Sequence, residues 1–111
     1  MQPSAPFRDR EFNGTTLLEE WAELRAVNES PLAVAHASRM VRGLSGASVG
    51  DVRTRLAQWA AAARQETPAL SALVQRWAGR IRTPPDAGLF AAHLERLALV
   101  GEALTGEGRR P

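Results

Sequence analysis

Apolar residues recur three and four positions apart along most of the chain, which is the period of an amphipathic helix. They fall into five runs, over residues 17–27, 32–44, 52–63, 70–81 and 87–104, and each run is expected to turn its apolar side inward. No run shows the alternation typical of a half-buried strand. The pattern predicts an all-α fold, a compact bundle of four to five antiparallel helices joined by short loops.

Start signals precede the first three runs. Thr16 followed by Glu19 has the spacing of a capping box, in which two side chains satisfy backbone N–H groups at a helix start. Ser30-Pro31 is a capping residue followed by a proline that suits the first helical position. Ser48 or Asp51 is expected to cap the third helix.

Proline-containing segments separate the later runs and set the domain limits. Thr67-Pro68 restarts or kinks the chain before the fourth helix, and Thr83-Pro84-Pro85-Asp86 is the clearest break in the sequence. Asp86 is expected to cap a last helix over about 87–104. We therefore predict one domain over 14–104 and a flexible tail over 105–111. Residues 1–13 are predicted to be an extended arm with Phe7 and Phe12 as its apolar anchors.

Three of the predicted helices carry one tryptophan each on the inward side. Because an indole buries more apolar area than any aliphatic side chain, Trp21, Trp59 and Trp77 are expected to be the main supports of a core otherwise built from leucine and alanine. The same periodicity places Glu19, Glu20 and Glu23 on the solvent side of the first helix.

The amino-acid composition excludes several kinds of functional site. The 111 residues include no cysteine, which excludes disulfides, thiolate metal sites and a cysteine nucleophile. All 14 basic residues are arginine, a bias typical of GC-rich, bacterial coding sequences. No run of about 18 apolar residues and no secretory signal pattern occurs, so we expect a cytoplasmic protein without a membrane span.

Candidate catalytic groups are few. The two histidines, His36 and His93, fall on different predicted helices, and His93 is expected at the edge of an apolar stripe. His36 and Met40 share a helix face, but no haem attachment motif accompanies them. No cluster of histidines and carboxylates has metal-ligand spacing, and no nucleophile or phosphate-loop motif occurs. We expect no enzyme activity, no cofactor, no bound metal and no small-molecule substrate.

Charge is distributed unevenly along the chain. Residues 1–30 carry a net charge of −3, residues 31–82 a net charge of +6 and residues 83–111 a net charge of −1. Either these regions face each other within the fold, or the basic middle forms a surface for an acidic partner. The candidate partner-binding residues are the arginines of this middle region: Arg39, Arg42, Arg53, Arg55, Arg76 and Arg80.

These features favour a non-catalytic helical interaction or accessory module, one that binds a protein partner, associates with itself or packs on a larger enzyme. The alternative is a nucleic-acid-binding protein that uses the arginine-rich region 39–82. Residues 31–64 would then form a helix, a glycine-containing turn and a recognition helix over 48–59 that carries Arg53 and Arg55. That turn is longer than the three or four residues usual in helix–turn–helix proteins.

Three stretches carry a resemblance to a known family. They are residues 10–13 (Arg-Glu-Phe-Asn), residues 52–59 (Val-Arg-Thr-Arg-Leu-Ala-Gln-Trp) with 70–73 (Leu-Ser-Ala-Leu), and residues 97–104 (Leu-Ala-Leu-Val-Gly-Glu-Ala-Leu). In this order they resemble the helical C-terminal extension that follows the catalytic barrel of some bacterial family 20 glycoside hydrolases, the β-N-acetylhexosaminidases.

The resemblance covers about residues 10–104 and implies a helical appendage of a larger enzyme. The sequence departs from the family pattern at residues 60–63, four alanines where polar residues are expected, and in a longer middle section. The family's catalytic Asp-Glu pair belongs to the barrel, which this chain does not contain. The resemblance therefore carries over no catalytic residue.

Overall fold

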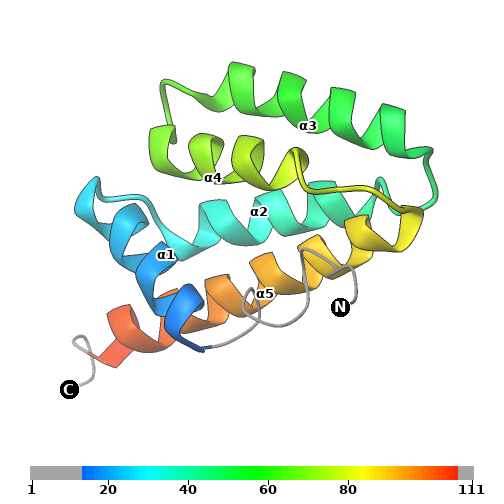
Figure 1. The fold of residues 1–111 in the computed structure, drawn as a ribbon. Helices are drawn as coiled ribbons and strands as arrows, with labels where there is room; N and C mark the ends of the chain where they lie inside the picture. The colour runs from blue at the N-terminus through cyan, green and yellow to red at the C-terminus, as the bar shows by residue number, and fades with distance from the viewer. Residues whose placement is uncertain (1–13, 108–111) are drawn as a thin grey trace.

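The structure, a computed structural model, describes residues 14–107 (Figure 1). Within this range the chain forms five helices and no strand: α1 (Gly14–Ala26), α2 (Pro31–Arg42), α3 (Val49–Ala63), α4 (Pro68–Ala78) and α5 (Pro84–Glu107). The all-α prediction is confirmed. The predicted arm over 1–13 and the last four residues of the predicted tail lie outside the described residues.

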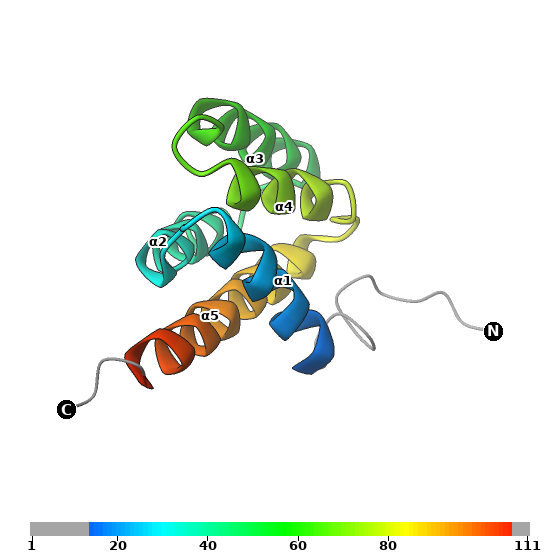
Figure 2. The ribbon, with the colours of Figure 1, turned by 90° about the vertical axis from the view of Figure 1, so that its left-hand side faces the viewer.

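The helices form two antiparallel pairs joined by α1. α3 packs along α4, which follows it in sequence, whereas α2 packs along α5, more than 40 residues further on (Figures 1 and 2). α1 packs against both α5 and α4, and so connects the two pairs. The described part of the chain places apolar side chains of all five helices in one core.

The predicted caps of α2 and α3 are present. The Ser30 hydroxyl accepts a hydrogen bond from the Ala33 N–H at 3.2 Å, and Pro31 follows it in the first turn. Ser48 caps α3 by accepting from the Asp51 N–H, also at 3.2 Å, which decides between the two predicted caps. Local sequence is sufficient here because a capping side chain bonds backbone only two or three residues away.

Two predicted helix starts were wrong. α1 begins at Gly14, so Thr16 lies inside the first turn and does not cap it. α5 begins at Pro84, three residues before the predicted start, and continues to Glu107. Asp86 lies within its first turn, where one carboxylate oxygen accepts from the Arg82 and Thr83 N–H groups at 2.8 and 3.0 Å. Its carboxylate therefore holds the end of the preceding loop against the start of α5, although Asp86 itself lies inside the helix.

The tryptophans contribute unequally to the core. Trp77 is fully buried and stacks on Phe90 with ring centroids 5.8 Å apart, and Trp21 is also buried. Trp59 is only half-buried, so its predicted role as a main support was wrong. α3 packs on α4 and buries one narrow side, formed by Val52, Leu56 and Ala60, which leaves Trp59 at the edge of the contact.

Four side chains predicted to face inward are instead exposed. All four remain accessible to solvent; they are Leu18 and Val27 of the first run, Leu32 of the second and Leu104 of the fifth. Each lies at the end or edge of its apolar run, where the buried side of the helix is narrower than the periodicity suggests. Leu99 is exposed as well.

Candidate functional site

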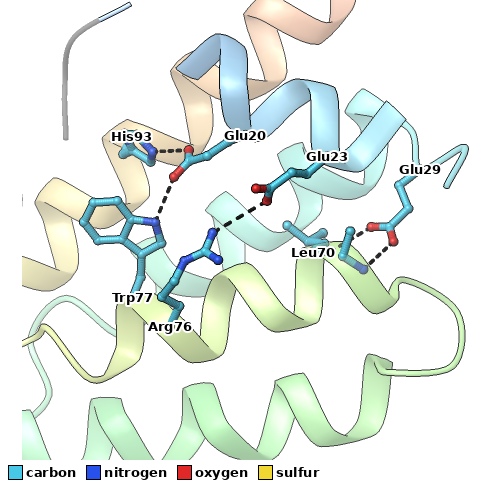
Figure 3. Close-up of polar contacts among 8 residues, drawn as sticks. Glu20, Glu23, Glu29, Leu70, Arg76, Trp77 and His93 are labelled. Atoms are coloured by element: carbon cyan, nitrogen blue, oxygen red, sulfur yellow. Dashed lines mark hydrogen bonds and ion pairs between the residues drawn. The ribbon is translucent and has the colours of Figure 1, made fainter. Parts of the chain in front are cut away.

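A buried carboxylate connects three helices. Glu20 of α1 is only 6% exposed. Its Oε2 accepts a hydrogen bond from Trp77 Nε1 of α4 at 3.2 Å, and its Oε1 lies 2.7 Å from His93 Nε2 of α5 (Figure 3). One side chain thus joins α1 to both of the helices on which it packs.

Glu20 and His93 were both misplaced by the sequence interpretation. Glu20 was assigned to the solvent side of α1 with Glu19 and Glu23, which are exposed; His93 was placed at a boundary but is completely buried. The spacing of Glu20 from the apolar residues of α1 did indicate that its side chain is buried. Glu20 lies three residues after Leu17 and four before Leu24, both buried, so it occupies the apolar stripe itself.

The His93 ring is enclosed by its neighbours. It lies against the Trp77 indole with ring centroids 5.0 Å apart, and its side chain has no exposed surface. A carboxylate that orients an imidazole is an arrangement found in hydrolases, where the second ring nitrogen must reach the substrate. Because this ring is wholly buried, a substrate in solvent has no access to it. The Glu20–His93 pair is therefore suited to joining helices.

A surface cleft of about 270 Å³ lies between α1 and α4 beside this pair. Its walls are formed by Thr16, Glu19, Glu20 and Glu23 of α1 and by Arg76, Trp77 and Arg80 of α4. Arg76 reaches across to Glu23, at 3.8 Å between Nη2 and Oε1, and the Arg80 guanidinium lies 4.8 Å from the centre of the Trp77 ring. The cleft is therefore acidic on the α1 side and basic on the α4 side (Figure 3).

A second buried carboxylate caps α4 from a distant part of the chain. Glu29, in the loop between α1 and α2, accepts from the Ala69 N–H at 2.7 Å and from the Leu70 N–H at 2.9 Å. Thr67, the local capping candidate, donates its hydroxyl to the Ala63 carbonyl of the previous helix instead. The sequence predicted where α4 begins but gave no sign that Glu29, about 40 residues earlier, supplies its cap.

The loop that presents Glu29 contains an unusual backbone conformation. Asn28 has a φ of 63°, and it is the only residue other than glycine with positive φ in the described chain. Asparagine tolerates this left-handed conformation better than most residues. The turn redirects the chain directly after α1, so that the following carboxylate faces the start of α4.

Three of the six candidate arginines, Arg42, Arg53 and Arg76, bind residues of other elements of the fold. Arg42 pairs with Glu95 of α5 at 2.8 Å. Arg53 donates to the Ala78 and Gly79 carbonyls at the end of α4, at 3.4 and 3.1 Å. Of the six, only Arg76 and Arg80 are brought together, on the cleft; Arg39 and Arg55 are exposed on α2 and α3. Much of the basic middle region therefore faces other elements of the same fold.

The helix arrangement bears on the nucleic-acid alternative. A helix–turn–helix unit packs its recognition helix against the helix before it. Here α3 packs principally on α4, and α2 on α5, while Arg53 is directed at backbone carbonyls. Arg55 is the exposed arginine left on α3. The nucleic-acid interpretation stays a prediction without added support.

Comparison with known proteins supplies no relative. No protein-family model, no curated protein and no solved structure matches the chain. Within the described residues, no group of three or more histidines and carboxylates is placed to hold a metal ion. None of the described helices is both long and apolar enough to cross a membrane. The glycosidase-extension resemblance stays a prediction.

Proposed function

We propose that this protein is a non-catalytic helical module that binds a protein partner or a second copy of itself through the outer sides of α2 and α5. The observation that carries the proposal is the exposure of Leu32 on α2 and Leu99 on α5, each 63% accessible to solvent. They are the most exposed large apolar side chains in the described chain, and they lie on two helices packed against each other.

The surroundings of these leucines support an interface. α2 carries only basic ionisable residues, His36, Arg39 and Arg42, whereas Leu99 lies between Glu95 and Glu102 at helical spacing on α5. The Arg42–Glu95 ion pair joins the two helices at the surface. Apolar side chains bordered by charged ones match the composition of protein–protein interfaces, which have an apolar centre and a polar rim.

The buried Glu20–His93 pair supports the non-catalytic part of the proposal. Both Glu20 oxygens are engaged by neighbouring helices, and the imidazole is closed off from solvent. Glu20 and His93, two buried ionisable residues of the described chain, are thus used in packing the helices against each other.

Replacing the two leucines tests the proposal. The Leu32→Ser/Leu99→Ser double variant is compared with Leu18→Ser, a matched control because Leu18 is 54% exposed but lies on α1. Sedimentation velocity over a range of concentrations measures self-association, and crosslinking followed by mass spectrometry identifies a bound partner. We expect the wild type and the control to associate, and the double variant to lose at least about tenfold in affinity, since burying two leucines at an interface contributes more than 1.4 kcal/mol.

Two results would contradict the proposal. One is a wild-type protein that is monomeric at all concentrations and binds no partner. The other is association that the double variant retains at the wild-type level while its helix content, measured by circular dichroism, is unchanged.

A further inference from the structure

A cavity of about 170 Å³ lies between α1 and α5, near the C-terminal ends of both helices. Its walls are formed by Trp21 and Arg25 of α1 and by Leu104 and Thr105 of α5. In other proteins a cavity of about 150 Å³ holds one benzene molecule. The space between α1 and α5 is therefore large enough for a ligand of that size.

The Trp21 indole brings an unpartnered hydrogen-bond donor to this cavity. The Trp21 side chain is 4% exposed, and its Nε1 is buried without a hydrogen-bond partner in the described chain. Trp77, the other fully buried tryptophan, donates to Glu20. Buried indole N–H groups usually have an acceptor, because a buried donor without one keeps the full cost of its desolvation. An acceptor that enters the cavity would remove this cost at Trp21.

The packing of Trp21 leaves room for an acceptor to approach. The edge of its six-membered ring, at Cζ3 and Cη2, is packed against Gly101 of α5. Nε1 belongs to the other ring of the indole and so lies away from that contact. Arg25 follows Trp21 by one turn of α1, and Leu104 follows Gly101 by one turn of α5. Both of these side chains are exposed, so they can change rotamer and admit an acceptor to Nε1.

The charge of the wall favours an anionic acceptor. Arg25 is the one ionisable residue among the four that line the cavity. The Thr105 hydroxyl donates to the Gly101 carbonyl of its own helix, and the last carbonyls of α1 accept from backbone N–H groups of residues 27–29. The donors left for a ligand are thus the indole N–H and the guanidinium. A carboxylate suits both, because it only accepts hydrogen bonds and its charge is opposite to that of Arg25.

From the unpartnered Trp21 N–H, the charge of Arg25 and the size of the cavity, we propose that this cavity binds a small carboxylate. The carboxylate accepts from Trp21 Nε1 and from the Arg25 guanidinium, and an apolar group about the size of a benzene ring packs against Leu104. The protein holds this ligand without converting it. The inference goes beyond the proposed function, because the cavity includes neither Leu32 nor Leu99.

Titration with benzoate, followed by NMR, tests the proposal. The protein has three tryptophans and therefore three indole N–H signals, each of which reports on a different place in the fold. Benzoate is added at constant ionic strength up to about 50 mM, since so small a ligand is expected to bind with millimolar affinity. We expect the Trp21 indole signal to move in a saturable manner, while those of Trp59 and Trp77 stay in place. Benzamide, the neutral analogue, should bind more weakly.

A pair of arginine variants shows whether the charge of Arg25 is responsible. Arg25→Gln should weaken benzoate binding by about tenfold, since it removes a charged hydrogen-bond donor. Arg39→Gln is the matched control, because Arg39 is an exposed arginine of α2 that does not line the cavity; this variant should bind as the wild type does. Three results would overturn the proposal: a Trp21 signal that benzoate does not move, equal binding of benzamide and benzoate, or equal affinities of the two variants. Self-association through Leu32 and Leu99 is measured separately by sedimentation, so either proposal can fail without the other.

Discussion

At the scale of single residues, Gly101 shows how closely three helices approach each other. A Cβ atom at this position of α5 would lie 2.8 and 2.9 Å from Cζ3 and Cη2 of the Trp21 ring. It would also lie 3.1 Å from Cγ of Pro31 at the start of α2. The absence of a side chain at Gly101 thus lets α1, α2 and α5 meet around the Trp21 indole.

Gly101→Ala is therefore expected to destabilise the fold by about 1–3 kcal/mol, the usual cost of overpacking a rigid neighbour. This is opposite in sign to the normal effect of alanine within a helix. Gly88→Ala provides the control in the same helix, since nothing lies within 4 Å of its added Cβ; it should stabilise the fold by about 0.5–1 kcal/mol. Urea unfolding followed by circular dichroism measures both. Equal effects of the two substitutions would show that Trp21 can move aside at little cost.

At the scale of elements, α4 is held at both ends by side chains from other parts of the chain. Glu29 accepts two backbone N–H groups at its start, and Arg53 of α3 donates to two carbonyls at its end. A helix leaves its first N–H groups and last carbonyls without partners inside the helix. These two contacts satisfy part of both sets, and the negative and positive charges also match the helix dipole.

Removing the distant cap should loosen the start of α4 in particular. We expect Glu29→Ala to cost about 1–2 kcal/mol, as for loss of other capping side chains. Amide hydrogen exchange should become faster at Ala69 and Leu70, whose N–H groups bond Glu29 directly. Glu66→Ala is the matched control, because Glu66 is exposed and adjacent to α4 in sequence; its effect should stay within about 0.5 kcal/mol. A larger effect at Glu66 than at Glu29 would place the cap in the local sequence instead.

At the scale of the whole molecule, α1 is the element that joins the α2–α5 pair to the α3–α4 pair. Its packing on both is reinforced by Glu20, which bonds Trp77 on one side and His93 on the other. A buried polar group that loses its partner keeps the full cost of its desolvation. The Glu20 carboxylate therefore couples the two pairs, because either one moving away would leave buried polar atoms without partners.

Glu20→Ala should accordingly destabilise the whole fold, by about 3 kcal/mol or more, since it removes the hydrogen-bond partner of two buried side chains, Trp77 and His93. Glu20→Gln keeps the shape and one carbonyl acceptor, so a smaller loss is expected. The control is Glu19→Ala at the exposed neighbour, with an effect within about 0.5 kcal/mol. Denaturant unfolding should be followed both by circular dichroism and by tryptophan fluorescence. If the Glu20→Ala and Glu19→Ala proteins unfold at the same denaturant concentration, the carboxylate does not couple the helix pairs.

The sequence by itself determined the class of fold and several of the helix limits. Helical spacing of apolar residues predicted four to five helices, of which the structure has five. The Ser30 and Ser48 caps were recognisable because a capping side chain acts on backbone close to it in sequence. Trp21 and Trp77 were correctly expected in the core for a similar reason, since each lies well inside a run of apolar positions.

Only the tertiary structure decided which helices pair and what the buried polar groups do. These contacts join residues 40 or more positions apart in the sequence. They are the pairing of α2 with α5, the Glu29 cap on α4 and the contacts of Glu20 with Trp77 and His93. Periodicity describes one helix at a time, so it cannot tell a carboxylate facing water from one facing a partner on another helix. The half-buried position of Trp59 has the same origin, because the number of neighbours around α3 is a property of the assembled bundle.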